Sequence, residues 1–336
     1  MDNKKYYEPG FRADGALLTC MYGRPAPHHS AAAYVPSVTS PSLKQRCSHR
    51  PGLASAIRAQ KGLFWLLFAP LFFVLSSCTQ NNVKQDNSLK KYFDENNLTG
   101  TFALMDNGTG LFTVYNLPRY RDSAYLPAST FKIVNSLIGL QTGKITSDSM
   151  VIAWDGVQRP VPEWNKNLNM YEAFRASSVP YYQEVARRIG KDTMQFWLDS
   201  LHYGSGKKDT LFKISGAIDT FWLDNSLKIT PDENLGLVKK LYFNELPFFK
   251  LYQEKVKHAM LFESNANYRL AYKTGWAATE QNHALGWMAG WIEENNHPYF
   301  FVLNVESTDP NYDMSTVRLK MLKDILKQLG FFEGKM

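Results

Sequence analysis

Hydrophobic and polar positions follow two different periods along the chain. Alternating runs over residues 100–106 and 111–116 flank Asn107-Gly108, and this pattern predicts a β-hairpin. Between Ser129 and Gln141 apolar residues recur at helical spacing. Further helices are predicted over residues 88–97, 180–189, 191–201, 231–246, 248–261 and 315–329, and further strands over 268–274, 284–293 and 299–306.

The order of these elements indicates the fold class. Strands occur towards both ends and helices fill the middle, which predicts an α/β (α+β) fold: an antiparallel sheet flanked by helices, with a helical insert. We expect residues 150–201 to be mostly helical after a loop. The domain is predicted to span residues 88–336, with a mixed part over about 88–130 and 232–336 and a helical part over about 131–231.

A short apolar segment precedes this domain. Residues 62–74 are apolar, follow several basic residues and are shorter than the roughly 20 residues of a membrane span. We interpret residues 61–77 as a signal peptide. The sequence Leu75-Ser76-Ser77-Cys78 resembles the lipobox of bacterial lipoproteins, which implies lipid attachment to Cys78 and a polar tether over 78–87. An uncleaved apolar anchor with an incidental cysteine is the alternative interpretation.

The lipobox resemblance also implies a location. It predicts export to the periplasm, with the lipid holding the protein on a membrane, and Thr79 rather than Asp after the cysteine favours the outer membrane. Residues 1–60 lie before the basic start of the signal peptide. We hypothesise that they are an unstructured leader that is not normally translated.

Charge and cysteine content exclude several functions. The net charge is +7, but residues 1–77 contain nine Lys and Arg and three Asp and Glu, which leaves 29 basic and 28 acidic residues in 78–336. The nearly neutral domain has no strong electrostatic footprint for nucleic acid. No cysteine follows Cys78, which excludes disulfides and a cysteine-ligated zinc site there. The histidines show no metal-ligand spacing.

A serine and a lysine stand three residues apart at the start of the predicted helix 129–141. Ser129 and Lys132 therefore lie on one helix face. Ser129 falls in the first turn, where free N–H groups and the helix dipole favour the negative charge that a nucleophile's reaction creates. S-x-x-K arises about once by chance in such a chain, as a capping serine and a solvated lysine. The apolar neighbours Phe131 and Val134 disfavour a solvated lysine.

Two further motifs follow in order. Ser177-Ser178-Val179 opens a predicted helix, where a capping serine is the commoner reason for the pattern. Lys273-Thr274-Gly275 ends the predicted strand 268–274, and it is either an ordinary strand end or a site for a carboxylate beside a closely approaching backbone. The order of S-x-x-K, a serine-bearing loop and K-T-G is that of penicillin-recognising serine enzymes.

On these motifs the sequence resembles the class D (oxacillinase-type) serine β-lactamases over about residues 88–330. Residues 127–140 (PASTFKIVNSLIGL) resemble the family's nucleophile helix. The family's S-x-V motif is matched by Ser177-Ser178-Val179-Pro180, and its omega loop by Phe221-Trp222-Leu223 with residues 226–231. Its third motif is matched by Lys273-Thr274-Gly275-Trp276, and the strand after it by Gly286-Trp287 with residues 290–293. Its carboxylate-binding arginine is matched by Arg318. Tyr203-Gly204-Ser205 departs from the family's Tyr-Gly-Asn; we expect activity to survive, because the resemblance implies a structural role there.

The resemblance implies hydrolysis of penicillin-type antibiotics through an acyl-enzyme on Ser129, and hence β-lactam resistance. Burial can keep a lysine neutral. The resemblance implies that Lys132 then adds carbon dioxide, becomes N6-carboxylysine and acts as general base, with Trp222 donating its indole N–H to the carbamate. Ser177, with Lys273 nearby, would pass a proton to the lactam nitrogen. No metal and no cofactor besides carbon dioxide is implied.

The remaining implied roles concern the substrate. Thr274 and Arg318 would hold its carboxylate, and backbone N–H groups of Ser129 and Trp276, next to Gly275, would bind the oxyanion. Apolar side chains would keep the site dry, namely those of Phe131, Val179 and Leu223. Taken singly, a tryptophan such as Trp222 is more often a core residue, and a lone arginine is more often a surface ion-pair partner.

Other functions remain open at this point. A membrane-tethered β-lactam sensor would be acylated and not deacylated, but it needs transmembrane helices and an effector domain. A penicillin-binding peptidase shares S-x-x-K and K-T-G, and a surface lipoprotein could keep the fold without activity. The Phe-Trp-Leu loop and the intact motif residues favour the β-lactamase. The sequence leaves open the substrate range and whether the protein is a monomer or a homodimer.

Overall fold

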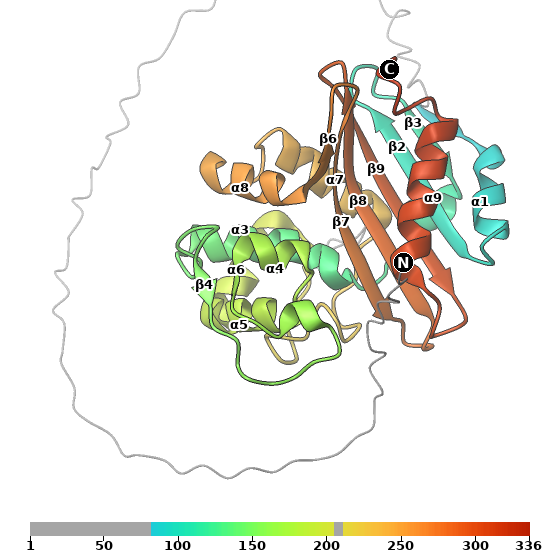
Figure 1. Cartoon of the computed structure of the whole chain (residues 1–336). Helices are drawn as coiled ribbons and strands as arrows, with labels where there is room; N and C mark the ends of the chain where they lie inside the picture. Colours follow the sequence, from blue (N-terminus) through green and yellow to red (C-terminus); the bar gives the residue numbers. More distant parts are fainter. Residues whose placement is uncertain (1–81, 205–210) are drawn as a thin grey trace, which may run out of the picture. The chain divides into compact units, whose positions relative to one another are not determined.

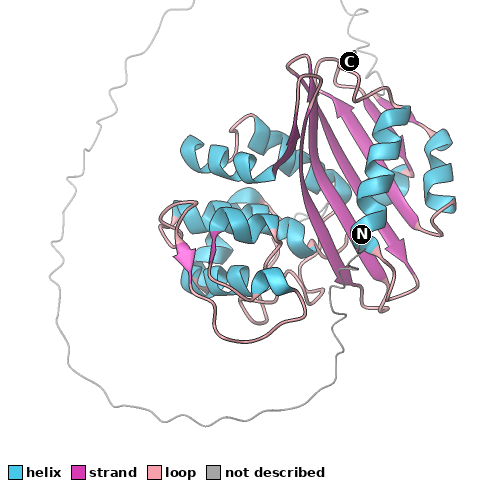
Figure 2. Cartoon of the chain, viewed as in Figure 1, coloured by secondary structure: helices cyan, strands magenta, loops and turns pink. Residues whose placement is uncertain are grey.

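The computed structural model describes residues 82–204 and 211–336. They form a large sheet with helices on both of its faces (Figures 1 and 2). The strands are β1 (Val83–Gln85), β2 (Thr99–Asp106), β3 (Phe112–Tyr115), β4 (Val151–Ile152), β5 (Leu168–Asn169), β6 (Leu261–Ser264), β7 (Arg269–Ala278), β8 (Ala284–Glu294) and β9 (His297–Ser307). The α-helices are α1 (Lys90–Asp94), α2 (Leu117–Asp122), α3 (Lys132–Gln141), α4 (Met170–Arg175), α5 (Val179–Ile189), α6 (Lys191–Leu201), α7 (Pro231–Tyr242), α8 (Lys250–Met260) and α9 (Met314–Gln328).

The large sheet has the strand order β1-β3-β2-β9-β8-β7-β6. All neighbouring strands run antiparallel except β1 and β3, which pair in parallel at one edge. The predicted α/β (α+β) fold, an antiparallel sheet flanked by helices, is therefore confirmed. The small pair β4 and β5 forms a separate sheet.

The centre of the sheet is buried on both faces. Every residue of β8 is buried, and its side chains alternate between two hydrophobic clusters. Trp287 and Ala289 belong to the cluster on the side of α3 and α7, whereas Met288 and Ile292 belong to the cluster that contains residues of α1 and α9. Figure 1 shows α1 and α9 together on one side of the sheet. This double coverage explains why the central strands have near-continuous apolar sequences.

The helical insert contains less helix than its sequence predicts. Residues 150–169 were expected to be mostly helical, but they form turns, the short pair β4–β5 and a single 3-10 turn at Pro162–Trp164. Side chains replace backbone hydrogen bonds in this segment: Asn167 accepts from the Trp154 amide at 2.9 Å and Asn165 accepts from the Arg159 amide at 2.8 Å. Such side-chain bonds to the backbone compete with helix formation.

Two short edge strands were not predicted. β1 lies inside the stretch that the sequence assigned to a tether, and β6 directly follows α8. Each is only three or four residues long, and each becomes a strand by pairing with a neighbour that is distant in sequence or across a turn. The predicted leader, signal peptide and Cys78 lie outside the described residues, and so does Ser205.

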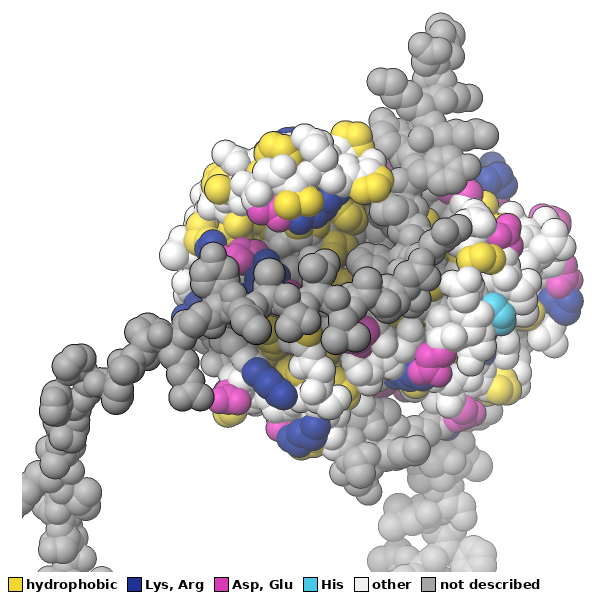
Figure 3. Space-filling model, turned by 90° about the horizontal axis from the view of Figure 1, so that it is seen from below, with side chains coloured by type: hydrophobic (Ala, Val, Ile, Leu, Met, Phe, Trp, Pro, Cys, Tyr) yellow, Lys and Arg dark blue, Asp and Glu magenta, His cyan; other side chains and the backbone are white. Residues whose placement is uncertain are grey.

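The surface of the domain has no dominant charge on the face seen in Figure 3. Described acidic and basic side chains are mixed there, with apolar side chains between them. Within residues 82–204 and 211–336, no helix combines the length and the apolar character that crossing a membrane requires.

Gly290 on β8 is expected to tolerate no side chain. A Cβ atom there would stand 2.0 Å from the carbonyl oxygen of Ala271 on the paired strand. We expect Gly290→Ala to lower the free energy of unfolding by about 1–3 kcal/mol or more, as overpacking does. Gly236 in α7 is the matched control, since a Cβ there meets nothing within 4 Å, and Gly236→Ala should stabilise by about 0.5–1 kcal/mol. Urea unfolding of both variants measures this, and an unchanged midpoint for Gly290→Ala would contradict the expected clash.

Candidate active site

The predicted Ser-Lys pair forms a direct contact at the start of the first long helix of the insert. Residues 128–131 form a 3-10 turn that leads into α3 at Lys132. Side chains three residues apart are eclipsed in a 3-10 turn, and the Lys132 Nζ donates to the Ser129 Oγ at 2.7 Å. The Lys132 side chain is fully buried, and Ser129 is 8% exposed. Ser129 therefore lies at the surface end of this contact.

The backbone before Ser129 is held in an uncommon conformation. Ala128 has φ +49°, which is rare for a residue with a side chain. Its N–H donates to the Trp222 carbonyl oxygen at 3.2 Å. One residue earlier in the turn, the Pro127 carbonyl accepts from the Thr130 hydroxyl at 2.7 Å. These bonds fix the turn that carries the nucleophile candidate.

A tyrosine ring lies near the buried lysine, and the residue before the lysine stacks on a tryptophan. The Lys132 Nζ lies 5.5 Å from the ring centroid of Tyr182. Phe131 stacks on Trp222, with centroids 5.1 Å apart and an interplanar angle of 24°. Trp222 is fully buried, and its indole nitrogen has no hydrogen-bond partner among the described residues. A buried donor of this kind has a high desolvation cost unless an acceptor meets it.

The second serine meets the second lysine. Ser177 has φ +54° and precedes Ser178, which caps α5 by accepting from the Tyr181 N–H. The Lys273 Nζ donates to the Ser177 Oγ at 3.0 Å and to the Thr274 carbonyl at 3.1 Å. Lys273 is almost fully buried. The capping explanation therefore applies to Ser178, while Ser177 faces the strand β7.

The third motif packs directly against the nucleophile turn. A side chain at Gly275 would begin 3.2 Å from the Pro127 carbonyl oxygen and 3.2 Å from the Thr130 methyl carbon. Arg318 of α9 donates from Nη1 to the Gly275 carbonyl at 2.9 Å and is only 6% exposed. It is therefore a buried residue and not a surface one.

The other predicted site residues are partly accessible. Thr274 and Trp276 flank Gly275 on β7. Val179 begins α5 directly after residues 175–178, which are called the serine loop below. Leu223 follows Trp222 and packs against the core. All four are half-buried, so each leaves part of its side chain accessible.

Sequence reasoning missed the residues that support the nucleophile turn from behind. The Trp287 indole on β8 donates to the Leu126 carbonyl at 3.0 Å. Tyr125 and Ile229 exchange two backbone hydrogen bonds of 2.8 Å, which join the segment before Ser129 to the end of the 221–231 loop. The Gly-Trp pair at 286–287 was noticed as part of a strand, but no local signal shows which carbonyl its indole reaches.

Tyr203 begins the motif Tyr203-Gly204-Ser205, whose last residue departs from the family pattern. It is 5% exposed, and its ring lies 5.8 Å from that of Phe131. The hydroxyl is buried, and burial raises the pKa of Tyr203 far above its ordinary value. The contact with Phe131 is consistent with a packing role beside the site. Ser205 lies outside the described residues, so its role stays a prediction.

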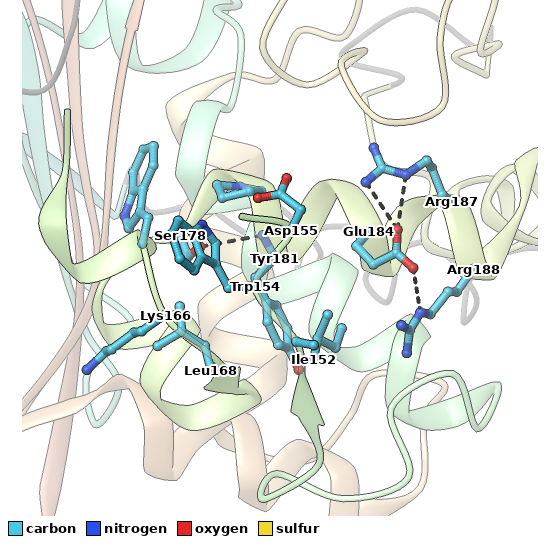
Figure 4. A pocket seen from close by; sticks show the side chains of 13 residues that line it. Ile152, Trp154, Asp155, Lys166, Leu168, Ser178, Tyr181, Glu184, Arg187 and Arg188 are labelled. Carbon is cyan, nitrogen blue, oxygen red and sulfur yellow. Dashed lines mark hydrogen bonds and ion pairs between the residues drawn. The ribbon is translucent and has the colours of Figure 1, made fainter. Parts of the chain in front are cut away.

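A separate surface cavity of about 190 Å³ lies beside the serine loop. It is lined by Ser178, Pro180 and Tyr181 of that loop and helix, together with Trp154 and Trp164 (Figure 4). None of the side chains that form the Ser129–Lys132 or Ser177–Lys273 contacts lines it. Within the described parts of the chain, no three His, Cys, Asp or Glu residues are grouped as metal ligands would be.

Comparisons with known proteins show which family the chain resembles. Residues 82–327 match the family described as the penicillin binding protein transpeptidase domain. The chain is 35% identical over 238 residues to beta-lactamase OXA-5 of Pseudomonas aeruginosa, covering 70% of this chain and 86% of that protein. The crystal structure of the class D β-lactamase YbXI from Nostoc matches with a TM-score of 0.66 and 37% identity, covering 73% of this chain and 99% of that one.

A regulatory relative also matches. The regulatory protein BlaR1 of Bacillus licheniformis is 32% identical over 215 residues, covering 64% of this chain but only 34% of that protein. The fold and site thus define a penicillin-recognising serine protein with the transpeptidase fold. Within that class, the chain belongs to the class D serine β-lactamase family.

The indole of Trp287 is expected to support the nucleophile turn. Trp287→Phe leaves the buried Leu126 carbonyl without its donor, which should lower the free energy of unfolding by about 1–3 kcal/mol. It should also slow acylation of Ser129 by a fluorescent penicillin. Trp291→Phe on the same strand is the control: that ring packs on Tyr242 and should leave acylation unchanged. Equal acylation rates in the two variants would contradict the supporting role.

Proposed function

We propose that this protein hydrolyses β-lactam antibiotics in two steps through an acyl-enzyme on Ser129. The observation that carries the proposal is the 2.7 Å contact between the fully buried Lys132 amine and the Ser129 hydroxyl. A serine becomes a nucleophile when an adjacent base takes its proton. Burial disfavours the ammonium form of a lysine, so Lys132 is suited to be neutral and basic.

Carboxylation of Lys132 deepens this proposal. The neutral amine nitrogen forms a bond to the carbon of carbon dioxide and releases one proton, which leaves an anionic carbamate whose oxygen atoms are basic. Trp222 fits such a group, because its buried indole N–H has no acceptor among the described residues and its ring stacks beside Phe131. Ser129 passes its proton to the modified Lys132, and its Oγ attacks the lactam carbonyl carbon.

The other residues serve the rest of the acylation step. When the lactam C–N bond breaks, the nitrogen takes a proton through Ser177, whose Oγ is 3.0 Å from the Lys273 Nζ. Backbone N–H groups of Ser129 and Trp276 stabilise the oxyanion. The substrate carboxylate is held by Thr274 and Arg318. Water is excluded by three apolar side chains, those of Phe131, Val179 and Leu223.

Deacylation distinguishes this function from that of a sensor. During acylation the modified Lys132 gives the proton from Ser129 to the lactam nitrogen by way of Ser177, so it is again a base. In a hydrolase it then accepts a proton from water while the water oxygen attacks the ester carbonyl, and it returns that proton to the Ser129 Oγ as the ester C–O bond breaks. The likeness to BlaR1 favours a second candidate, a penicillin receptor that stops at the acyl-enzyme. Both candidates share the fold and the Ser-Lys pair, so only turnover separates them.

Turnover of a chromogenic penicillin by residues 79–336 tests the proposal. We expect many turnovers per protein, stimulated by bicarbonate, and complete loss with Lys132→Ala. Trp222→Phe removes the indole donor and should reduce turnover at ambient carbon dioxide while added bicarbonate restores part of it. Trp197→Phe is the control, since the Trp197 ring contacts Phe196 and Phe248, neither of which belongs to the site.

Three results would contradict parts of this proposal. A single burst with a stable adduct on Ser129 by intact mass would identify a receptor instead of a hydrolase. Full turnover without carbon dioxide would exclude the carbamate. Equal behaviour of Trp222→Phe and the wild type would exclude the indole donor.

We further propose that the mature protein is tethered to a membrane by lipid on Cys78, and the test uses the protein from its native host. A lipid there is supported by the sequence Leu75-Ser76-Ser77-Cys78 after an apolar segment. The intact mass of native protein should correspond to a chain that starts at a lipidated Cys78, and Cys78→Ala should release the protein from the outer-membrane fraction. An unmodified Cys78 would contradict the tether, and any peptide from residues 1–50 would contradict the downstream translation start.

A further inference from the structure

Arg175 occupies a position that the reaction steps above do not explain. It ends α4 and stands two residues before Ser177. Its side chain is half-buried, and no carboxylate in the described parts of the chain forms an ion pair with it. A guanidinium placed this way must gain its stabilisation from hydrogen bonds and aromatic faces.

The guanidinium joins the serine loop to the edge strand β6. Arg175 Nη1 donates to the Leu261 carbonyl at 2.6 Å. Its central carbon lies 3.9 Å from the ring centroid of Phe262, a cation–π distance, and 5.6 Å from that of Tyr171. The hydrogen bond fixes the direction of the side chain, and the ring of Phe262 fixes its plane.

The stack continues to the strand that carries the second catalytic lysine. Phe262 lies parallel to Tyr272, with centroids 4.3 Å apart and an interplanar angle of 7°. Tyr272 directly precedes Lys273 on β7 and is 5% exposed. Burial and the Glu263 carboxylate raise the pKa of Tyr272 to about 12, so this ring stays neutral. Arg175, Phe262 and Tyr272 thus form a continuous stack from the loop to β7.

The serine loop needs such an anchor. Ser177 has φ +54°, a conformation that persists only when its surroundings impose it. Inside the insert the loop is held by backbone bonds and by the Trp164 indole, which donates to the Ala176 carbonyl at 2.9 Å. Among the described residues, two hydrogen bonds join residues 175–178 to the large sheet: Arg175 to Leu261, and Lys273 to Ser177. The second is the contact that the proposed proton transfer uses.

We propose that Arg175 is a positioning residue that holds the Ser177 hydroxyl at hydrogen-bond distance from Lys273 during acylation. This inference rests on the proposed function, because it concerns the proton that reaches the lactam nitrogen. Arg175 acts through Ser177 and does not itself contact the reacting atoms. Its loss should therefore lower the rate of the chemical step more than the apparent affinity for substrate.

A double-mutant cycle with Ser177 tests this inference. The acylation rate by a fluorescent penicillin is measured for the wild type, Arg175→Ala, Ser177→Ala and the double variant. We expect Arg175→Ala to reduce the acylation rate constant at saturating penicillin on the order of tenfold or more, since a displaced catalytic group has effects of that size. The penicillin concentration that gives the half-maximal rate should change little. In the Ser177→Ala background the same substitution should have no further effect, because coupled residues are not additive.

Matched variants keep the test decisive. Phe262→Leu removes the aromatic face but leaves the Arg175 hydrogen bond, so it should lower the acylation rate by a smaller factor. If Arg175→Ala fails to fold, Phe262→Leu replaces it in the double-mutant cycle with Ser177→Ala. Arg159→Ala is the control, because that arginine pairs with Asp155 in the insert away from the stack and should leave acylation unchanged.

The outcomes separate this inference from the proposed function. If the wild type is acylated normally, and Arg175→Ala lowers the acylation rate by the same factor with Ser177 present and in the Ser177→Ala variant, the positioning role is overturned. The proposed function then stays intact. Wild-type rates in Arg175→Ala would do the same. A wild type that no penicillin acylates would overturn the proposed function, and the positioning role would fall with it.

Discussion

The hydrogen bond between the buried Lys132 amine and the Ser129 hydroxyl is the contact on which the rest of the site depends. An amine at zero exposure is strongly destabilising unless it is neutral or well partnered. The Tyr182 ring lies 5.5 Å from the Lys132 amine, and the preceding residue, Phe131, stacks on Trp222. The helical insert is therefore built around a polar group that a folded core would ordinarily exclude, as is common at functional sites.

The sheet supplies the rigid side of the same site. Its central strands are buried on both faces, so their register cannot shift without moving a whole set of apolar side chains to the wrong face. β7 presents Lys273 and Gly275, and the neighbouring β8 presents the Trp287 indole that holds the segment before Ser129. The reaction geometry is thus defined between a rigid sheet and a turn fixed by hydrogen bonds, which favours a pre-organised site.

This arrangement explains why hydrolases and receptors share one family. In the proposed function, acylation uses a nucleophile, its base and a proton route, and these are assigned to the contacts of Ser129 with Lys132 and of Ser177 with Lys273. Release of the acyl group needs the base a second time, with a water molecule correctly placed. The two proposed functions therefore differ in this later step.

The sequence by itself determined the elements with strong periodicity, including the hairpin β2–β3, the long helices and the central strands. It also determined the pair of Ser129 and Lys132, because residues i and i+3 must meet in one helical turn. It did not reveal β1, β6 or the irregular segment 150–169, because short strands form only through pairing and side-chain bonds replaced the expected helix. Only the tertiary structure brought Ser177 to Lys273, Trp287 to Leu126 and Arg175 to Phe262. These partners are separated by 87 to 161 positions, and chain folding rather than local periodicity decides which of them meet.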